Sequence, residues 1–228
     1  MRRPRPIGAE NGKAAARGAK PKTRTNDPDR TKANILEIAT HEFSEKGLSG
    51  ARIDEIAERT RTSKRMIYYY FESKEGLYRA VLEDAYRRIR AIERSLDLEH
   101  KPPLEALAQH VRFTFDHQLG NEDFIRLVMV ENIHRGEHIA RLPELVAING
   151  PAVRLLARLL SRGRETGEFR DDVDAVDVHL MISAFCFFRV ANQHTFGTLF
   201  GRDLLDPARR AHYRTMLSDM VVAHLTST

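Results

Sequence analysis

The chain has a single cysteine, Cys186, no tryptophan and no long run of apolar residues. One thiol excludes a disulfide framework or a four-cysteine zinc site within the chain, and it favours a reducing, intracellular compartment. No stretch approaches the roughly 18 consecutive apolar residues of a membrane span, and no apolar segment follows the basic first residues as it would in a signal peptide. These absences predict a soluble, cytoplasmic protein that does not enter a membrane.

The chain also lacks the short motifs of common catalytic sites. It contains no nucleophile elbow, phosphate-binding loop, dinucleotide-binding glycine pattern or zinc-binding helix motif. His134 and His138 lie four residues apart near Glu131 and Glu137, but Gly136 between them interrupts the helix that a metal site there would need. We therefore expect no metal, no cofactor and no enzymatic activity.

Positive charge is concentrated at one end of the chain, whose formal net charge is +5. Residues 1–30 contain nine Lys or Arg and three acidic residues, a net +6, so the other 198 residues sum to −1. Because residues 1–29 are rich in proline, glycine and alanine, they are predicted to form a disordered basic tail. Such a tail either contacts nucleic acid or is a solubilising extension, and the sequence leaves both interpretations open. Order is expected to begin where Asp29 or Thr31 caps the first helix.

Apolar residues recur at helical spacing through the rest of the chain. Ile35, Ile38, Ala39 and Phe43 predict a first helix that ends at Gly47. No segment alternates as a β-strand does, so the predicted fold class is all-α, with about nine helices. The other helices and loops are expected at about residues 53–59, 64–70, 74–96, 104–119, 123–133, 151–165, 174–194 and 207–225, with a glycine-containing loop at 197–201.

Residues 47–78 have the pattern of a helix-turn-helix. Two short predicted helices are separated by the polar turn at 60–63, an arrangement in which the first helix crosses a DNA backbone and the second enters the major groove. Apolar residues of both helices face a core, which leaves a basic and aromatic set on the outer face of the second. Two large aromatic residues on that face are unusual unless a partner covers them. The outward set comprises Lys64, Arg65, Met66, Tyr69 and Tyr70.

This segment resembles the DNA-binding domain of the TetR (tetracycline-repressor) family of bacterial regulators. The resemblance covers residues 30–80 and implies a three-helix helix-turn-helix domain at 30–75, followed by a helical ligand-binding and dimerisation domain at 76–228. The residues that carry it are Phe43, Gly47, Ile53, Ile56, Ala57, Ser63, Lys64, Ile67, Tyr68, Tyr70, Phe71, Ser73, Lys74, Glu75 and Leu77.

The resemblance implies roles for individual side chains. Ser63 is expected to cap the recognition helix and to donate to a phosphate, and Lys64, Arg65, Met66 and Tyr69 are expected to occupy the turns that reach base edges. Arg65 is the candidate for a bidentate contact to guanine. Two further residues, Tyr70 and Lys74, match phosphate contacts of the family, whereas Tyr68 is expected to support the packing of the domain.

One position departs from the family pattern. Arg52 stands just before the first short helix, where the family usually has Ser or Thr. A guanidinium binds phosphate but cannot accept a hydrogen bond from the helix N–H groups. The helix cap is therefore in doubt, and Ser49 is the alternative cap if the helix starts earlier.

Polar residues in the apolar helices of the remainder allow two interpretations. They either line a pocket for a small molecule, or they are hydrogen-bonded residues of the core or of a dimer interface. Arg189 interrupts an apolar run, so its charge needs an acid across a dimer or an anionic effector, whereas Cys186 is expected in the core. The ligand candidates are His110, Phe113, His117, Met129, Asn132, Arg189 and Asn192.

The leading hypothesis is a homodimeric repressor that is released from a near-palindromic operator in double-stranded DNA by a small-molecule effector. The helices at 174–194 and 207–225 are expected to pair with their copies in the dimer. Two alternatives are a non-specific architectural DNA-binding protein that uses its basic tail and, further away, an enzyme.

Overall fold

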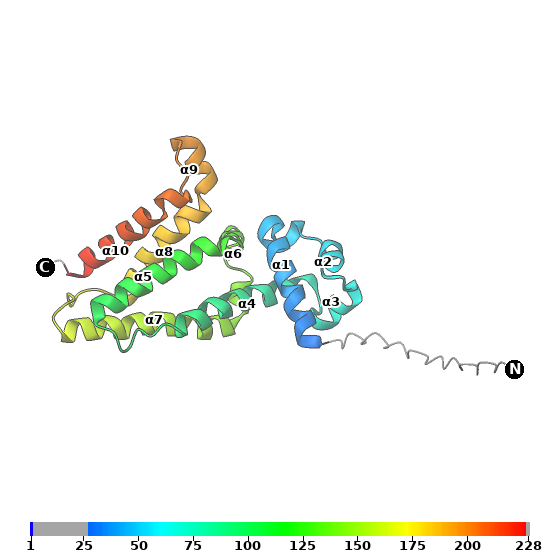
Figure 1. Cartoon of the computed structure of the whole chain (residues 1–228), viewed down its shortest axis with the longest axis horizontal. Helices are drawn as coiled ribbons and strands as arrows, with labels where there is room; N and C mark the ends of the chain where they lie inside the picture. Colours follow the sequence, from blue (N-terminus) through cyan, green and yellow to red (C-terminus); the bar gives the residue numbers. More distant parts are fainter. Residues whose placement is uncertain (2–26, 227–228) are drawn as a thin grey trace.

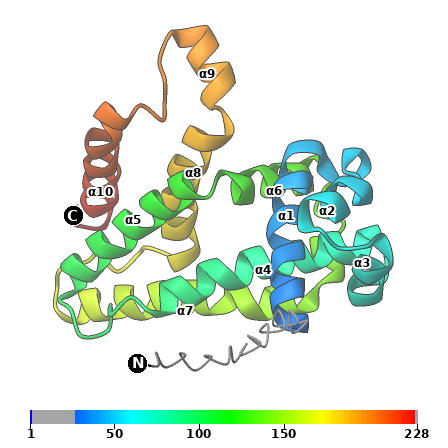
Figure 2. The same ribbon diagram turned by 45° about the vertical axis from the view of Figure 1, so that its right-hand side comes forward.

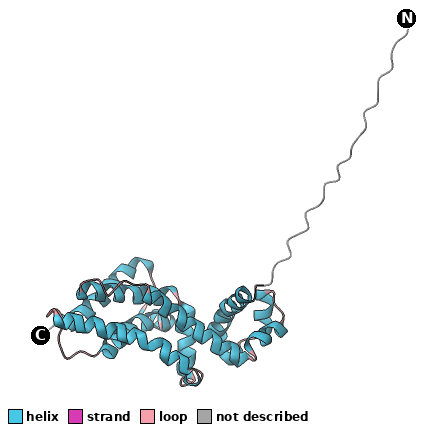
Figure 3. Ribbon diagram, turned by 90° about the horizontal axis from the view of Figure 1, so that it is seen from below, coloured by secondary structure: helices cyan, strands magenta, loops and turns pink. Residues whose placement is uncertain are grey.

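A computed structural model describes Met1 and residues 27–226 of the chain, and all regular structure in these residues is helical (Figure 1 and Figure 3). The all-α prediction is confirmed. The described part has ten α-helices, against about nine predicted, and two short 3-10 helices. The elements are α1 (Pro28–Gly50), α2 (Ile53–Thr60), α3 (Lys64–Phe71), α4 (Lys74–Arg94), α5 (Pro103–Gly120), α6 (Glu122–Ile133), η1 (Ile139–Arg141), α7 (Pro143–Glu165), α8 (Ala175–Ala191), α9 (Gln193–Phe200), η2 (Pro207–Arg209) and α10 (Arg210–Thr226).

The helices enclose two hydrophobic cores. The smaller core lies among α1 to α4 and contains Phe43, Ile56, Ile67 and Tyr78, all fully buried. The larger core is built mainly by α5, α7, α8 and α10. Helix α4 runs from the small core along the larger part, where it contacts α7, and α6 packs on α1 (Figure 2). The three short helices are therefore fixed at one end of the molecule.

The first helix starts earlier than predicted. Most of the predicted basic tail, residues 2–26, lies outside the described residues. The cap of α1 is Asp27, whose carboxylate accepts from Asp29 N at 3.1 Å and Arg30 N at 3.3 Å, so the prediction of Asp29 or Thr31 is wrong. Pro28 begins the helix because the first turn needs no N–H from it.

The predicted break at Gly47 is present, whereas the predicted start of α7 is wrong. Gly47 has φ +64° and ψ 178°, and α1 continues for one more short turn beyond it. Helix α7 begins at Pro143 and passes through Pro151, where the prediction started it. Leu145 in the added turns is 1% exposed. Its burial offsets the hydrogen bond that Pro151 removes.

The predicted loop at 197–201 is also wrong, because residues 193–200 form α9 and Gly201, at φ +63°, ends it. Figure 2 shows α9 projecting from the end of α8, away from the other helices. Within residues 27–226 no single helix has the length and apolar character to cross a membrane. Helices α8 and α9 reach them only as a pair, and that pair is bent by 71°.

Candidate DNA-binding surface

The recognition helix α3 is held at both of its ends. At its start the Ser63 hydroxyl accepts from Met66 N at 3.2 Å, as predicted for the cap. The turn before it is closed by Arg61 in the left-handed region, φ +52°, and by Thr62 N donating to Ala57 O at 3.0 Å. On the inner face Ile67 is fully buried. These contacts fix the orientation of α3 relative to α2, as groove recognition requires.

The outer face of α3 is exposed, basic and aromatic. Arg65 is exposed and Tyr69 has 76% of its surface exposed, while Met66 is half-buried. Lys64 is also exposed and forms an ion pair with Asp54 of α2. The side chains expected at base edges therefore point away from the core, and nothing in residues 27–226 covers Arg65 or Tyr69.

The neighbouring tyrosines differ from expectation. Tyr68 was expected to support packing but is 42% exposed, whereas Tyr70 is half-buried against the small core. The spacing explains the difference, because Ile67, Tyr70 and Phe71 are three and four residues apart and share one helix face. The Lys32 ammonium of α1 lies 5.3 Å from the Tyr70 ring centre, which places a cation beside that ring.

The starts of helices α4 and α2 lie beside the outer face of α3. Lys74 begins α4, and its Nζ donates to Ser49 O at 3.2 Å, while the Ser73 hydroxyl caps the helix at Gly76 N. Arg52 is exposed at the start of α2 and makes no side-chain cap, as the sequence indicated, and Ser49 does not replace it. The Arg52 backbone N–H instead donates to the buried carboxylate of Glu42 at 3.1 Å. Lys74 and Arg52 therefore flank α3, and hydrogen bonds hold the backbone from which they extend.

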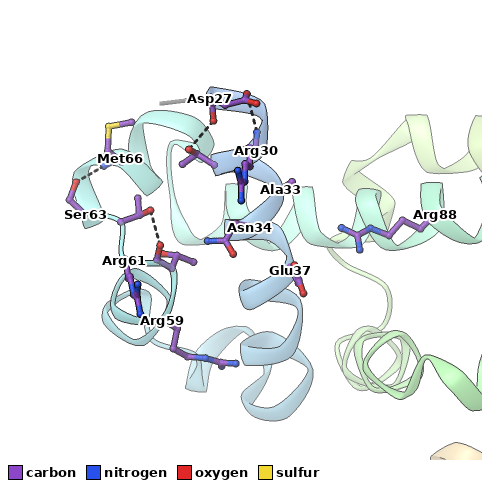
Figure 4. A pocket seen from close by; sticks show the side chains of 13 residues that line it. Asp27, Arg30, Ala33, Asn34, Glu37, Arg59, Arg61, Ser63, Met66 and Arg88 are labelled. Atoms are coloured by element: carbon purple, nitrogen blue, oxygen red, sulfur yellow. Dashed lines mark hydrogen bonds between the residues drawn. The ribbon is translucent and has the colours of Figure 1, made fainter. Parts of the chain in front are cut away.

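A polar cleft of about 860 Å³ lies between the first half of α1 and the turn that precedes α3 (Figure 4). Four arginines, Arg30, Arg59, Arg61 and Arg88, line it together with acidic Asp27 and Glu37, and Met66 and Ser63 of the recognition helix border it. The sequence prediction did not include these arginines. Arg59 precedes the turn and Arg61 lies in it, which was the available signal. The cleft extends the basic character of the surface beside α3.

Comparisons with known proteins agree with this geometry. Residues 35–81 match the model of bacterial regulatory proteins of the tetR family, and residues 103–221 match that of the tetracyclin repressor-like C-terminal domain. The HTH-type transcriptional repressor NicS of Pseudomonas putida is 36% identical over 202 residues, which are 89% of this chain and 95% of NicS.

The chain belongs to the TetR family.

Further relatives agree with that membership. The HTH-type transcriptional repressor SCO4008 of Streptomyces coelicolor is 30% identical over 72% of this chain and 80% of its own length. The solved structure of the regulator SCO4942 from Streptomyces coelicolor has 28% identity and a TM-score of 0.62, over 83% of this chain and 97% of that one. FadR of Bacillus subtilis, solved in complex with stearoyl-CoA, shares the fold at 18% identity, with a TM-score of 0.64 over 85% of this chain and 98% of that one.

Membership of the TetR family makes this chain a helix-turn-helix transcriptional regulator and not an enzyme. The pattern of residues 43–77 therefore identified the family correctly. The same match covers the larger helical part, for which the sequence offered only length and helical content.

The seven predicted ligand residues of this TetR-family chain do not gather at one place. His110 is buried on α5, and Phe113 and His117 lie half-buried on the same helix. Asn132 is exposed on α6 and donates to Val128 O of its own helix, so it does not line an internal pocket. Asn192 ends α8 and bonds back to Phe188 O, and Met129 is half-buried on α6.

The Arg189 guanidinium is held by contacts that include no acid, although its buried Nε makes no hydrogen bond. Its Nη2 donates to Leu204 O at 2.6 Å, and the guanidinium lies 4.4 Å from the centre of the Phe115 ring and 4.6 Å from that of Tyr213. Within residues 27–226 it pairs with no carboxylate. Its charge is stabilised by ring faces and a carbonyl, so it belongs to the packing of α8 against α5 and α10. Cys186 beside it is buried in the core, as predicted.

A buried carboxylate holds α6 to α4 and η1 beside the small core. Glu131 of α6 is 1% exposed, and it accepts from the Tyr78 hydroxyl at 2.9 Å and from Ile139 N at 3.2 Å, while His138 Nδ1 lies 3.0 Å away. Burial is the first cause of the raised pKa of Tyr78 and the Glu131 carboxylate is the second, so the Tyr78 hydroxyl stays a neutral donor. The sequence drew attention to Glu131 and His138 only as unlikely metal ligands. Their observed contacts link α4, α6 and η1.

Proposed function

We propose that this chain is a homodimeric transcriptional repressor that binds a near-palindromic operator through α3 and releases it when a small molecule binds the larger helical part. The observation that carries the proposal is the capped, rigid α3 with exposed Arg65 and Tyr69. Two relatives with high coverage, NicS and SCO4008, are both named repressors. Such a protein acts in the cytoplasm, where bacterial DNA is.

In this proposal α3 lies in the major groove. Arg65 reads a guanine edge, Met66 and Tyr69 pack on base edges such as thymine methyl groups, and Lys64 contacts DNA at the start of the helix. Phosphates on both sides of the groove are bound by Arg52, Ser63, Tyr70 and Lys74.

The dimer forms through α8 and α10. Helix α8 carries an exposed apolar stripe at four-residue spacing, Val176, Leu180, Ala184 and Phe188, of which Leu180 is 62% exposed. Met220 on α10 is 46% exposed. A continuous apolar stripe on a helix is covered in a stable protein, and pairing α8 and α10 with their copies covers it. The dimer then presents two α3 helices to successive turns of the duplex, about 34–36 Å apart.

Fluorescence anisotropy with the DNA upstream of its own gene tests the function. At moderate salt the purified dimer is expected to bind this duplex at least about 1,000-fold more tightly than a scrambled duplex of equal length. Equal affinity for both duplexes would instead support the non-specific architectural alternative. The same assay with added small molecules identifies the effector by release of the labelled duplex.

A further inference from the structure

The larger helical part contains buried polar atoms without partners. Among the described residues, five buried side-chain nitrogen or oxygen atoms make no hydrogen bond. Native proteins satisfy nearly all such atoms, so each exception indicates a missing partner. Four of the five lie on α4 and α5, and only Arg189 Nε lies on α8. The four are Arg90 Nε, His110 Nδ1, His117 Nδ1 and Gln118 Oε1.

Arg90 stands out among them because it is a buried cation. Its side chain is 9% exposed, and its Nη1 donates to Glu93 Oε2 at 2.5 Å, an ion pair between residues three apart near the end of α4. A guanidinium has five N–H donors, and within residues 27–226 this is its one hydrogen bond. Burial lowers the pKa of Arg90 and the charge of Glu93 raises it, but an arginine stays protonated throughout the physiological range.

The charge of Arg90 reaches three histidines. Burial is the first cause and the charge of Arg90 a further cause of the lowered pKa of His110, His117 and His179, and the pKa of His110 falls to about 4. The histidines are therefore neutral near pH 7.

Arg90 and Glu93 also reach a crevice of about 600 Å³. Its walls are the end of α4, residues 95–100 and the face of α7 at Pro151 and Leu155, and its charged lining includes Arg154 and Arg158 as well as Asp97 and Glu99. This volume suits a small ligand. The crevice thus leads from the surface to the buried guanidinium of Arg90.

We propose that Arg90 binds the carboxylate of a small organic acid that enters through this crevice. The assignment rests on the proposed function, in which the larger part holds the effector, and it specifies the effector's chemical class. The buried guanidinium lines the crevice, and an anion supplies the acceptor that Arg90 Nε lacks.

Binding of matched acids and amides to the full-length protein tests the class. The probes are benzoate against benzamide and hexanoate against hexanamide, measured by isothermal titration and by the shift in Tm. At least one acid is expected to bind ten-fold or more tightly than its amide, because a charge-assisted hydrogen bond is about twice as strong as a neutral one. If neither acid is preferred over its amide, the assignment is wrong.

Variants of the ion pair locate the site. The double variant Arg90→Gln/Glu93→Gln keeps the net charge and the side-chain size, and it is expected to lose the preference for the acid. Arg87→Gln is the matched control on α4, because Arg87 is exposed and pairs with Glu83, and it is expected to keep the preference. An acid preference that survives in the double variant would place the anion elsewhere.

The single variant Glu93→Gln is expected to strengthen acid binding instead of weakening it, and it keeps the test valid if the double variant folds poorly. Removing the competing carboxylate leaves Arg90 unpaired, so the acid is expected to bind about ten-fold more tightly than to the unmodified protein and to raise Tm by a larger amount. An ion pair with only a structural role predicts no such gain. Operator binding is measured on the same samples without acid, so loss of the DNA-binding function is recognised separately from loss of acid binding.

Discussion

Arg65 and Arg189 show how the surroundings of a residue determine the use of its charge. Arg65 is exposed on α3, with its charge available to a polyanion. Arg189 is 4% exposed and stacks on two aromatic rings while bonding a carbonyl, so its charge is already stabilised inside the protein. The sequence alone shows a cation in an apolar run at position 189, and it does not show that rings 24 and 74 residues away fold onto it.

Replacing Arg65 or Lys74 separates base recognition from phosphate binding. Arg65→Ala is expected to reduce discrimination at one base pair per half-site by about 1–3 kcal/mol. Lys74→Ala is expected to weaken binding to all DNA sequences alike and to lower the slope of log K against log salt by about 1. Binding to a set of single-substituted operators at several salt concentrations measures both effects. Arg158→Ala on α7, whose arginine pairs with exposed Glu99, is the control and is expected to change neither.

His110 predicts a pH dependence of stability. Burial, together with the charges of His179 and Arg90, lowers its pKa in the folded protein from 6.5 to about 4. Between these values the unfolded chain binds more protons, so stability is complete above pH 6.5 and is lost as the pH falls towards 4. Between pH 7 and pH 5 the loss from this residue is about 2 kcal/mol.

Urea unfolding of the unmodified protein and of His110→Gln at both pH values measures this loss. Burial and Arg90 also lower the pKa of His117 and His179, so both proteins become less stable at pH 5. The variant is expected to lose less by about the stated amount. Equal losses in the two proteins would mean that His110 does not titrate as proposed.

The junction between α3 and α4 depends on a single glycine. A Cβ atom at Gly76 would lie 2.0 Å from the Phe71 carbonyl oxygen, which is backbone and cannot rotate away. Gly76→Ala is therefore expected to destabilise the helix-turn-helix by about 1–3 kcal/mol, with a parallel loss of operator binding. Thermal unfolding followed by circular dichroism measures the change.

Gly120→Ala at the end of α5 is the matched control. A Cβ atom there meets nothing within 4 Å, and alanine favours a helix over glycine by up to about 1 kcal/mol. Stability is expected to stay the same or rise slightly. A Gly76→Ala protein as stable as Gly120→Ala would show that the junction has room to move.

At the scale of elements, local chemistry predicted most of the structure. Ser63 and Ser73 cap their helices and Gly47 interrupts α1, because each acts through backbone within a few residues. The errors occurred where packing overrides local preference. Leu145 is buried in the first turns of α7, which runs on through Pro151, and α9 forms although glycine at 197 and 201 favours a loop.

The residues of the candidate site likewise fall into those that the local sequence predicts and those that it does not. The exposed face of α3 follows from helical spacing within eight residues, so the sequence places Arg65 and Tyr69 correctly on the outside. The positions of the arginines that line the cleft beside α3, and of Arg90 with its partner Glu93, depend on helices that are far apart in the chain. No spacing in the sequence shows that Arg90 is buried and lines a crevice together with residues of α7, and this arrangement needs the packed structure.

At the scale of the whole molecule, the exposed stripe on α8 predicts the oligomeric state. Leu180→Glu places a charge in the middle of the proposed interface and is expected to yield monomers in size-exclusion chromatography with light scattering. Operator affinity falls as well, because one α3 alone contacts only one half-site. Leu104→Glu on α5, where the leucine is 39% exposed, is the control and is expected to remain dimeric. A dimeric Leu180→Glu protein would place the interface on another surface.

The last prediction concerns the basic segment before α1, in which the positive charge of the chain is concentrated. Residues 2–26 contain eight Lys or Arg and one acidic residue. Each phosphate that they neutralise adds about 0.9 to the salt slope of DNA binding. Replacing the eight cations by glutamine, with the length unchanged, is therefore expected to lower operator affinity and flatten the slope, while the preference for operator over scrambled DNA survives because α3 sets it. Loss of the preference would assign recognition to the segment itself, and an unchanged slope would leave it a solubilising extension.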